Sequence, residues 1–246
     1  MADVAAFGDL HLVDDVSSAD WIVASVRDFG SGVGSLLPVT FETYARVLHP
    51  ASRDTDRGES VDVQWSAVAA ANGRIAHAAM EWVAITGDWR FEQYATQPDV
   101  WDQPPSTGSL PPRTARSLAE ALAPFTATPS KCWFGVWGGY GDAPGLTRTV
   151  PLIAMPQRKM ALLRGPLGAA GSAFSRLGWP DGASLWWPDD HSWCVATDID
   201  LMSTYVGGSA ECIGAVLADN RLEAYQVSVD QTVDWRSDTV NPTPEP

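Results

Sequence analysis

The chain has 246 residues, with 16 basic and 30 acidic side chains and a formal net charge of −14. Apolar residues make up 45% of it, which supports a buried core and excludes wholesale disorder. The acidic balance argues against a nucleic-acid partner, because binding to phosphates depends on lysine and arginine. No run of 18 apolar residues occurs, so we expect neither a spanning helix nor a membrane partner.

The cysteines and the first residues bear on the compartment. Cys132, Cys194 and Cys212 fit neither a disulfide framework nor a metal-binding spacing, and small buried thiols suit a reducing compartment. The first nine residues lack the basic and apolar regions of a secretory signal. The glycine-rich residues 31–35 lack the lysine of a phosphate loop. We therefore expect a cytoplasmic protein with no cofactor.

The first half of the chain predicts short helices and one strand. Residues 19–29 have helical apolar spacing after two serines that can cap the first turn. Residues 41–49 are rich in β-formers and predict a strand, whereas the mixed charge of residues 51–61 predicts an exposed loop. Residues 64–71 predict a helix, and residues 75–85 leave helix and strand open.

A proline-rich connector over residues 98–113 separates this half from a second, β-rich half. The elements expected after it are a helix over 115–123, a strand over 132–137, a hairpin of 150–155 with 159–164, a hairpin of 184–187 with 193–199, a helix over 209–218 and a strand over 222–229. Residues 237–246 contain three prolines and predict a loose tail.

These elements define the fold class. Hairpins mixed with helices, without regular βαβ alternation, favour an α+β fold with a mainly antiparallel sheet and flanking helices. We expect a single globular domain over residues 15–235, because the N-terminal half offers few strands to close a core of its own.

Tryptophan is unusually frequent in this chain, with 12 residues. On a strand over 132–137, Trp133 and Trp137 share one face, and Gly135 between them would open a slot for a flat ligand. The rings are either core packing, which we favour, or an exposed binding platform. The candidate binding residues are Trp133, Trp137, Tyr140, Trp186, Trp187 and Trp193.

Acidic residues near the second hairpin are candidates for acid–base chemistry. Asp198 and Asp200 would share one face of a strand, but hard metals need more oxygen ligands and no calcium loop is present, so we expect no metal site. His191 is a candidate general base because the neighbouring Asp190 carboxylate can orient its imidazole, although a histidine in such a turn is more often simply solvated. The candidate set is Asp189, Asp190, His191, Asp198, Asp200 and Glu223.

Two stretches carry a resemblance to known proteins. Residues 132–141 (CWFGVWGGYG) and 187–208, together with Leu37-Pro38, Tyr44–Pro50 and Trp65, resemble a family of uncharacterised actinobacterial cytosolic proteins to which no activity is attached. An N-terminal helix, a Leu-Pro step and a mixed sheet are similar, at the level of the fold alone, to SMI1/KNR4-like immunity proteins.

Two functional hypotheses follow. The first is a non-catalytic binding protein, of an immunity or adaptor kind, with an acidic, aromatic-rich surface against a protein partner. The acidic coat has two interpretations: it keeps the protein soluble, which we favour, or it attracts a basic partner. The alternative hypothesis is a carboxylate-dependent hydrolase that acts on a sugar-like substrate in an aromatic cleft, which needs two carboxyl groups about 5–10 Å apart.

Overall fold

The computed structural model describes residues 9–30, 32–92, 95–139, 150–172 and 182–245. A nine-stranded sheet has the strand order β1-β7-β5-β8-β9-β10-β2-β11, with β6 paired to β7, and these neighbouring strands pair antiparallel. Its strands are β1 (His11–Leu12), β2 (Thr43–Leu48), β5 (Cys132–Trp137), β6 (Ile153–Met155), β7 (Arg158–Gly165), β8 (Leu185–Pro188), β9 (Cys194–Ala196), β10 (Ser203–Gly208) and β11 (Ala224–Val227). The predicted α+β class with a mainly antiparallel sheet is confirmed.

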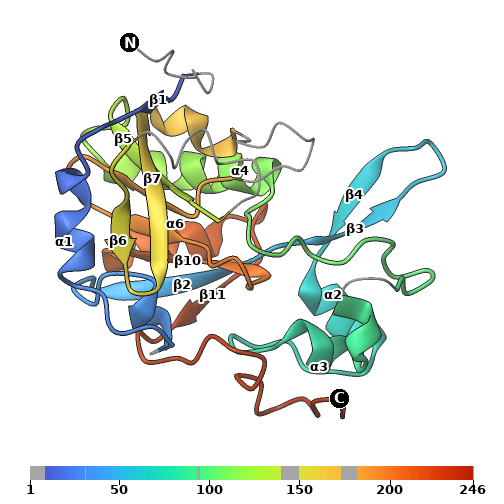
Figure 1. Cartoon of the computed structure of the whole chain (residues 1–246). Coiled ribbons are helices and arrows are strands. Elements are labelled where there is room, and N and C mark those ends of the chain that lie inside the picture. The colour runs from blue at the N-terminus through green and yellow to red at the C-terminus, as the bar shows by residue number, and fades with distance from the viewer. Residues whose placement is uncertain (1–8, 31, 93–94, 140–149, 173–181, 246) are drawn as a thin grey trace.

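Helices flank this sheet (Figure 1). They are α1 (Asp20–Val23), α2 (Trp65–Ala71), α3 (Trp82–Thr86), α4 (Pro112–Leu122) and α6 (Ala210–Ala218). Short 3₁₀ turns are η1 (Ser17–Ala19), η2 (Gly32–Ser35), η3 (Trp89–Glu92), η4 (Ala123–Phe125) and η5 (Leu167–Gly171). A separate antiparallel hairpin joins β3 (Ala51–Asp54) to β4 (Ser60–Val63).

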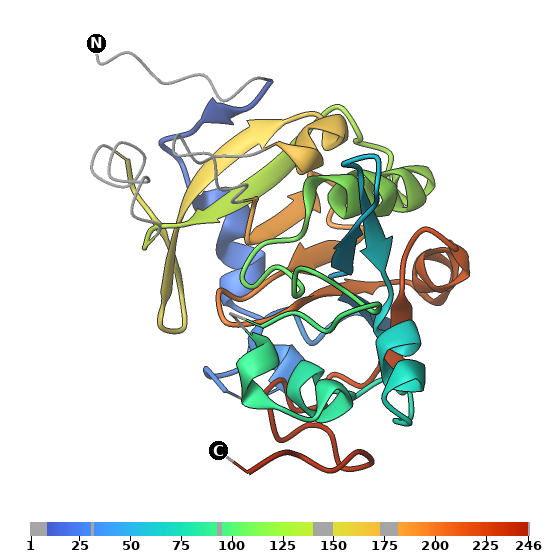
Figure 2. The ribbon, with the colours of Figure 1, turned by 90° about the vertical axis from the view of Figure 1, so that its right-hand side faces the viewer.

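The two faces of the main sheet pack against different helices because strand side chains alternate between faces. Leu118 of α4 and Ile213 of α6 share one apolar cluster with Phe134 of β5. Ile22 of α1 belongs to the cluster on the opposite face, with Leu162 of β7. A third cluster gathers around α2 and α3, which lie below the β3–β4 hairpin in both views (Figures 1 and 2).

Three local expectations are corrected. The helix expected over 19–29 ends at Val23, after which the chain turns toward η2. The loop expected over 51–61 is mostly the β3–β4 hairpin, and Ser52 on its outer edge forms an isolated bridge with Gln103 of the connector.

The expectation of a loose tail over residues 237–246 is also wrong for the first part of that range. Asp238 and Asn241 are buried, and Asn241 bonds both the main-chain N–H and the carbonyl of Ile75. Two side chains that satisfy main-chain groups hold this segment against the body of the protein.

Candidate functional site

Three of the predicted platform rings are in the core. Trp186, Trp187 and Trp193 have exposed fractions of 2%, 0% and 0%. Trp186 stacks on Phe134 and meets Trp193 edge to face, with ring centroids 5.5 Å apart. These rings contribute to stability and cannot form an exposed surface, so this part of the predicted binding set is wrong.

The expected slot at Gly135 is filled. A Cβ atom on Gly135 would lie 3.2 Å from the sulfur of Met160 and 3.3 Å from Cβ of Leu185, so no guest fits between the flanking rings. Trp133 and Trp137 are half-buried, and the Trp133 indole donates to Oδ1 of Asp189 at 3.0 Å. Tyr140 lies outside the described residues.

The predicted acids around the second hairpin are occupied by local contacts. Asp189 accepts from the ammonium of Lys131, which holds the pKa of Asp189 below its usual range. Asp190 accepts from the hydroxyls of Thr126 and Ser192 and organises the turn. His191 stacks on Trp21 at 4.3 Å, and burial lowers its pKa. These groups form a structural turn.

The remaining acids are divided between two cavities. Asp198 and Asp200 line one cavity, whereas Glu223 lines another. Both oxygens of Glu223 accept main-chain N–H groups at the start of α2, from Trp65 and Ser66. Glu223 is therefore committed to capping a helix, and the structure does not bring the six predicted acid–base candidates together.

The cavity lined by Asp198 and Asp200 combines aromatic with charged side chains, and we call it the aromatic cavity. Its volume is about 430 Å³. Its lining comes from β2, β7, β10, α2, α3, η2 and η3, and from the loops that carry Phe29, Asp198 and Asp234. The aromatic and charged lining residues are Phe29, Trp65, Trp82, Trp89, Tyr205, Trp235, Arg46, Glu81, Arg158, Asp198, Asp200 and Asp234.

A buried ion pair lies in the interior of this cavity. Arg46, 2% exposed, donates from Nη2 to Oε1 of Glu81 at 3.0 Å and from Nε to the hydroxyl of Ser203 at 3.0 Å. Its Nη1 donates to the carbonyls of Ala78 and Met80, so each nitrogen of the guanidinium has an acceptor. Burial raises the pKa of Glu81 to about 7, against the opposing charge of Arg46.

A second ion pair lies closer to the opening. Arg158 pairs with Asp198 at 2.7 Å and donates to the carbonyl of Ser35 at 2.9 Å. Its guanidinium also lies 4.7 Å from the ring centroid of Phe29. Burial lowers the pKa of Arg158, and the charge of Asp198 opposes this. The Nε atom of Arg158 is buried with no hydrogen-bond partner among the described residues.

The opening of the aromatic cavity combines exposed rings with carboxylates. Phe29 is 47% exposed and Trp235 is 44% exposed, which is unusual for such large apolar side chains. Asp200 and Asp234 are exposed and line the same cavity, and neither forms an ion pair within the described part of the chain. Arg236 lies over the Trp235 ring, with its guanidinium carbon 4.6 Å from the ring centroid.

Residues 232–235 form one wall of this cavity, and Asp238, which follows them, is bonded to the body of the protein. Asp238 pairs with His77 at 2.9 Å and accepts the main-chain N–H of Glu81. Burial opposes ionisation of Asp238, but hydrogen bonds from Asn241 and Val240 outweigh it and keep its pKa below the usual range. The wall that carries Trp235 is thus tied to the loop that carries Glu81.

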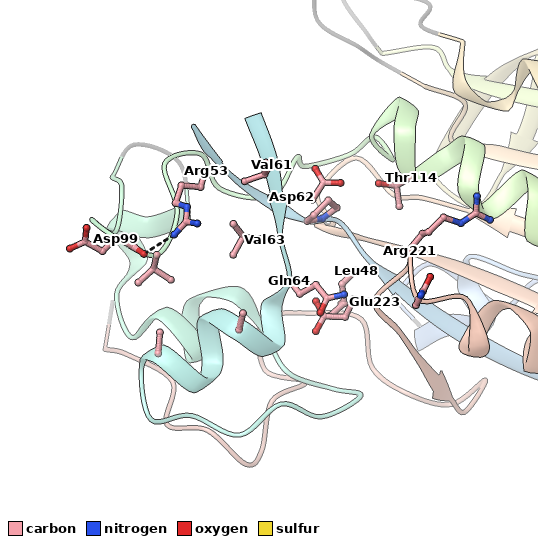
Figure 3. A pocket seen from close by; sticks show the side chains of 15 residues that line it. Leu48, Arg53, Val61, Asp62, Val63, Gln64, Asp99, Thr114, Arg221 and Glu223 are labelled. Carbon is pink, nitrogen blue, oxygen red and sulfur yellow. Dashed lines mark hydrogen bonds between the residues drawn. The ribbon is translucent and has the colours of Figure 1, made fainter. Parts of the chain in front are cut away.

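A second cavity, of about 620 Å³, lies between the β3–β4 hairpin, α2 and the start of α4 (Figure 3). We call it the hairpin groove. Val61, Asp62 and Val63 of β4 cross it, with Arg53 and Asp99 on one side and Thr114 and Arg221 on the other (Figure 3). The guanidinium of Arg53 donates to the carbonyl of Asp99 at 3.3 Å.

Sequence reasoning missed the central residues of the aromatic cavity. Arg46 lies within the strand expected over residues 41–49, and Glu81 lies within residues 75–85, for which the sequence leaves helix and strand open. Neither residue is a candidate for function on the sequence alone. The one available signal was an arginine within the apolar run of 44–48, because a charge at the centre of a buried strand requires a partner.

Comparisons with known proteins add nothing to this geometry: no protein-family model, no curated protein and no solved structure matches the chain. In the described residues, no helix is long and apolar enough to span a membrane. The same part of the chain contains no group of three or more His, Cys, Asp or Glu residues that could hold a metal ion.

Proposed function

We propose that this chain is a non-catalytic binding protein, of the immunity or adaptor kind, whose aromatic cavity takes a cationic side chain of a partner protein. The observation that carries the proposal is that two exposed rings, Phe29 and Trp235, line one cavity with two exposed carboxylates, Asp200 and Asp234, which form no ion pair within the described residues. The three buried, unpaired cysteines support a cytoplasmic location.

The charge of the site favours a cation over an anion. Both arginines that line the cavity already pair with a carboxylate, so an anionic guest would have to displace Glu81 or Asp198. A cation instead meets Asp200 and Asp234, in a chain whose formal net charge is −14. Such a field also accelerates the approach of a basic partner.

The rings favour a guanidinium or ammonium group. Arginines of this chain already lie over the Phe29 and Trp235 rings, at 4.7 Å and 4.6 Å. A cation over an aromatic face contributes about 0.5–1 kcal/mol at an exposed site. A volume of about 430 Å³ accommodates one long side chain rather than a folded segment.

The experiment is a calorimetric titration with the tripeptide amide Gly-Arg-Gly. The double variant Asp200→Asn, Asp234→Asn should bind it several-fold more weakly, because two carboxylates at the opening lose their charge. The control is Asp14→Asn, Asp56→Asn, which removes the same charge at exposed positions outside this cavity. If both double variants bind the tripeptide equally weakly, the loss of affinity comes from the change in net charge alone, and the proposed site is refuted.

A hydrolase is the second candidate, and one observation favours it. Glu81 faces the aromatic cavity with a pKa raised to about 7 by burial, which suits a general acid, and Asp198 lines the same cavity. We propose to test it with aryl glycosides: turnover abolished by Glu81→Gln would establish the hydrolase in place of the binding protein.

A further inference from the structure

The β3–β4 hairpin has one paired edge. The main-chain N–H of Ser52 donates to Gln103, and the carbonyl of Ser52 accepts from Asp102 and Gln103. The N–H of Asp54 points the same way and donates to the Asp102 carboxylate at 2.8 Å. The connector therefore occupies the outer edge of β3.

The opposite edge, on β4, has no strand paired with it among the described residues. In an antiparallel pair, both main-chain groups of a residue point either toward the partner strand or away from it, in alternation. Ser52 points away from β4, so its register partner Asp62 points away from β3, and Ser60 does the same opposite Asp54. Both residues are exposed, and their outward main-chain groups form no hydrogen bond within the described part of the chain.

The side chains of β4 line the hairpin groove beside this edge. Val61 and Val63 point toward Arg53 and Asp99, whereas Asp62 points toward the Thr114 side (Figure 3). An added strand would therefore find an apolar pair on one face and a carboxylate on the other. Natural edge strands are often protected by lysine, proline or a bulge, and the sequence of β4 contains neither lysine nor proline.

Charge selects the occupant of this edge. Residues 51–63 carry four acidic and two basic side chains, in a chain of formal net charge −14. Pairing β4 with β4 of a second copy would bring like charges together, which destabilises cross-strand pairs. A segment with lysine or arginine opposite Asp62 has the complementary charge.

From these observations we propose that β4 is a strand-addition site for an extended, basic segment of a partner protein, which would form main-chain hydrogen bonds with Ser60 and Asp62. This site is separate from the aromatic cavity and does not depend on its function. A partner that used both sites would gain affinity through linkage.

The experiment uses the whole chain and a synthetic peptide of alternating lysine and valine, KVKVKVK. Two comparison peptides replace lysine with glutamate or methylate alternate main-chain nitrogens. We expect the lysine peptide to bind and to slow hydrogen exchange at the amides of Ser60 and Asp62. The glutamate and methylated peptides should bind at least tenfold more weakly.

Two substitutions of Asp62 separate the contribution of its main-chain N–H to peptide binding from the contribution of its charge. Asp62→Pro removes the outward N–H without removing a β3–β4 hydrogen bond and should abolish binding, whereas Asp62→Asn keeps the N–H and should weaken it only a few-fold. If Asp62→Pro does not fold, the methylated peptide tests the same hydrogen bonds on the unchanged protein. Equal binding of the methylated peptide, no binding of the lysine peptide at millimolar concentration, or a dimer paired through β4 would overturn the proposal.

Discussion

At the scale of single residues, buried titratable groups have opposite effects on stability. Nδ1 of His49 donates to the carbonyl of Ser106 at 2.6 Å, so its Nε2 accepts from the hydroxyl of Thr204. Burial lowers the pKa of His49 to about 4. The unfolded chain therefore binds a proton at pH 4–6.5 that the folded chain does not, and His49 reduces stability as the pH falls through that interval.

Glu81 acts in the other direction. Its pKa is raised from 4.5 to about 7, so between these values the folded chain keeps a proton that the unfolded chain releases. The contribution of Glu81 to the free energy of unfolding therefore decreases as the pH rises from 4.5 to 7. Glu81→Gln cannot titrate but keeps a hydrogen bond to Arg46.

We predict that Glu81→Gln gains stability relative to wild type by roughly 1–3 kcal/mol as the pH rises from 4.5 to 7. Urea unfolding at several pH values measures the difference, and the His49 contribution cancels because both proteins share it. A difference that stays constant across the interval would show that Glu81 is ionised throughout.

The tryptophans provide a second prediction at this scale. Trp193 is fully buried, so Trp193→Ala should lower the free energy of unfolding by about 3–5 kcal/mol. Trp235 is 44% exposed, and Trp235→Ala should cost less than about 1.5 kcal/mol while weakening binding of a cation at the aromatic cavity. Melting curves of the two variants separate a core ring from a binding ring. A large loss on Trp235→Ala would place that ring in the core as well.

At the scale of elements, two neighbouring glycines show how η2 holds the segment after β11. Gly32 has φ +73°, and a Cβ there would lie 2.5 Å from the carbonyl oxygen of Gln231. That carbonyl accepts the N–H of Val33 at 3.0 Å, so the two segments cannot separate without losing a hydrogen bond. Gly30 has a similar φ of +83° but open space around it.

We predict that Gly32→Ala destabilises the protein by about 2–4 kcal/mol, because it adds a main-chain collision to the strain of a positive φ. Gly30→Ala is the matched control and should cost only about 1–2 kcal/mol for the conformation itself. Chemical denaturation measures both. Equal losses would mean that the segment after β11 moves freely away from η2.

Elements with complete local signals could be predicted from the sequence. The strand expected over 132–137 is β5, and the helix expected over 209–218 is α6, with Ser209 accepting the N–H of Cys212 as its cap. The β3–β4 hairpin was not predicted in this way, because its strands are short and charged residues stand among them and in the turn, and part of its support is the bridge from Ser52 to the connector about 50 residues later in the chain. Local charge indicated a loop, but the structure pairs β3 with β4.

At the scale of the whole molecule, the main sheet is built from both sides of the connector. β2 precedes residues 98–113 in the chain, and it lies between β10 and β11, which follow them. The prediction of one domain stays a prediction that proteolysis can test. Cleavage within 98–113 should leave fragments that remain associated and unfold together, as judged by gel filtration and a single melting transition. Two fragments that separate and fold alone would contradict it.

The candidate site was less predictable than the fold because it has no sequence motif. Its ion-paired residues, Arg46, Glu81, Arg158 and Asp198, come from four distant segments that only the tertiary structure brings together. Asp198 and Asp200 line the same cavity, but they lie in the turn after β9 and not on the strand that was expected to carry them, and their spacing does not reveal the arginine that pairs with Asp198. Trp235 lies near the end of the chain, in a segment without periodicity.

The central claim, a cation site at the opening of the aromatic cavity, is tested most directly by ¹⁹F NMR of protein labelled with 5-fluorotryptophan. The Trp235 resonance is assigned by its loss in Trp235→Phe, and Gly-Arg-Gly amide is titrated in. We predict a saturable shift of Trp235 with no shift of the buried Trp193, and no response to the neutral analogue Gly-citrulline-Gly. An unchanged Trp235 resonance, or an equal response to both peptides, would contradict the claim.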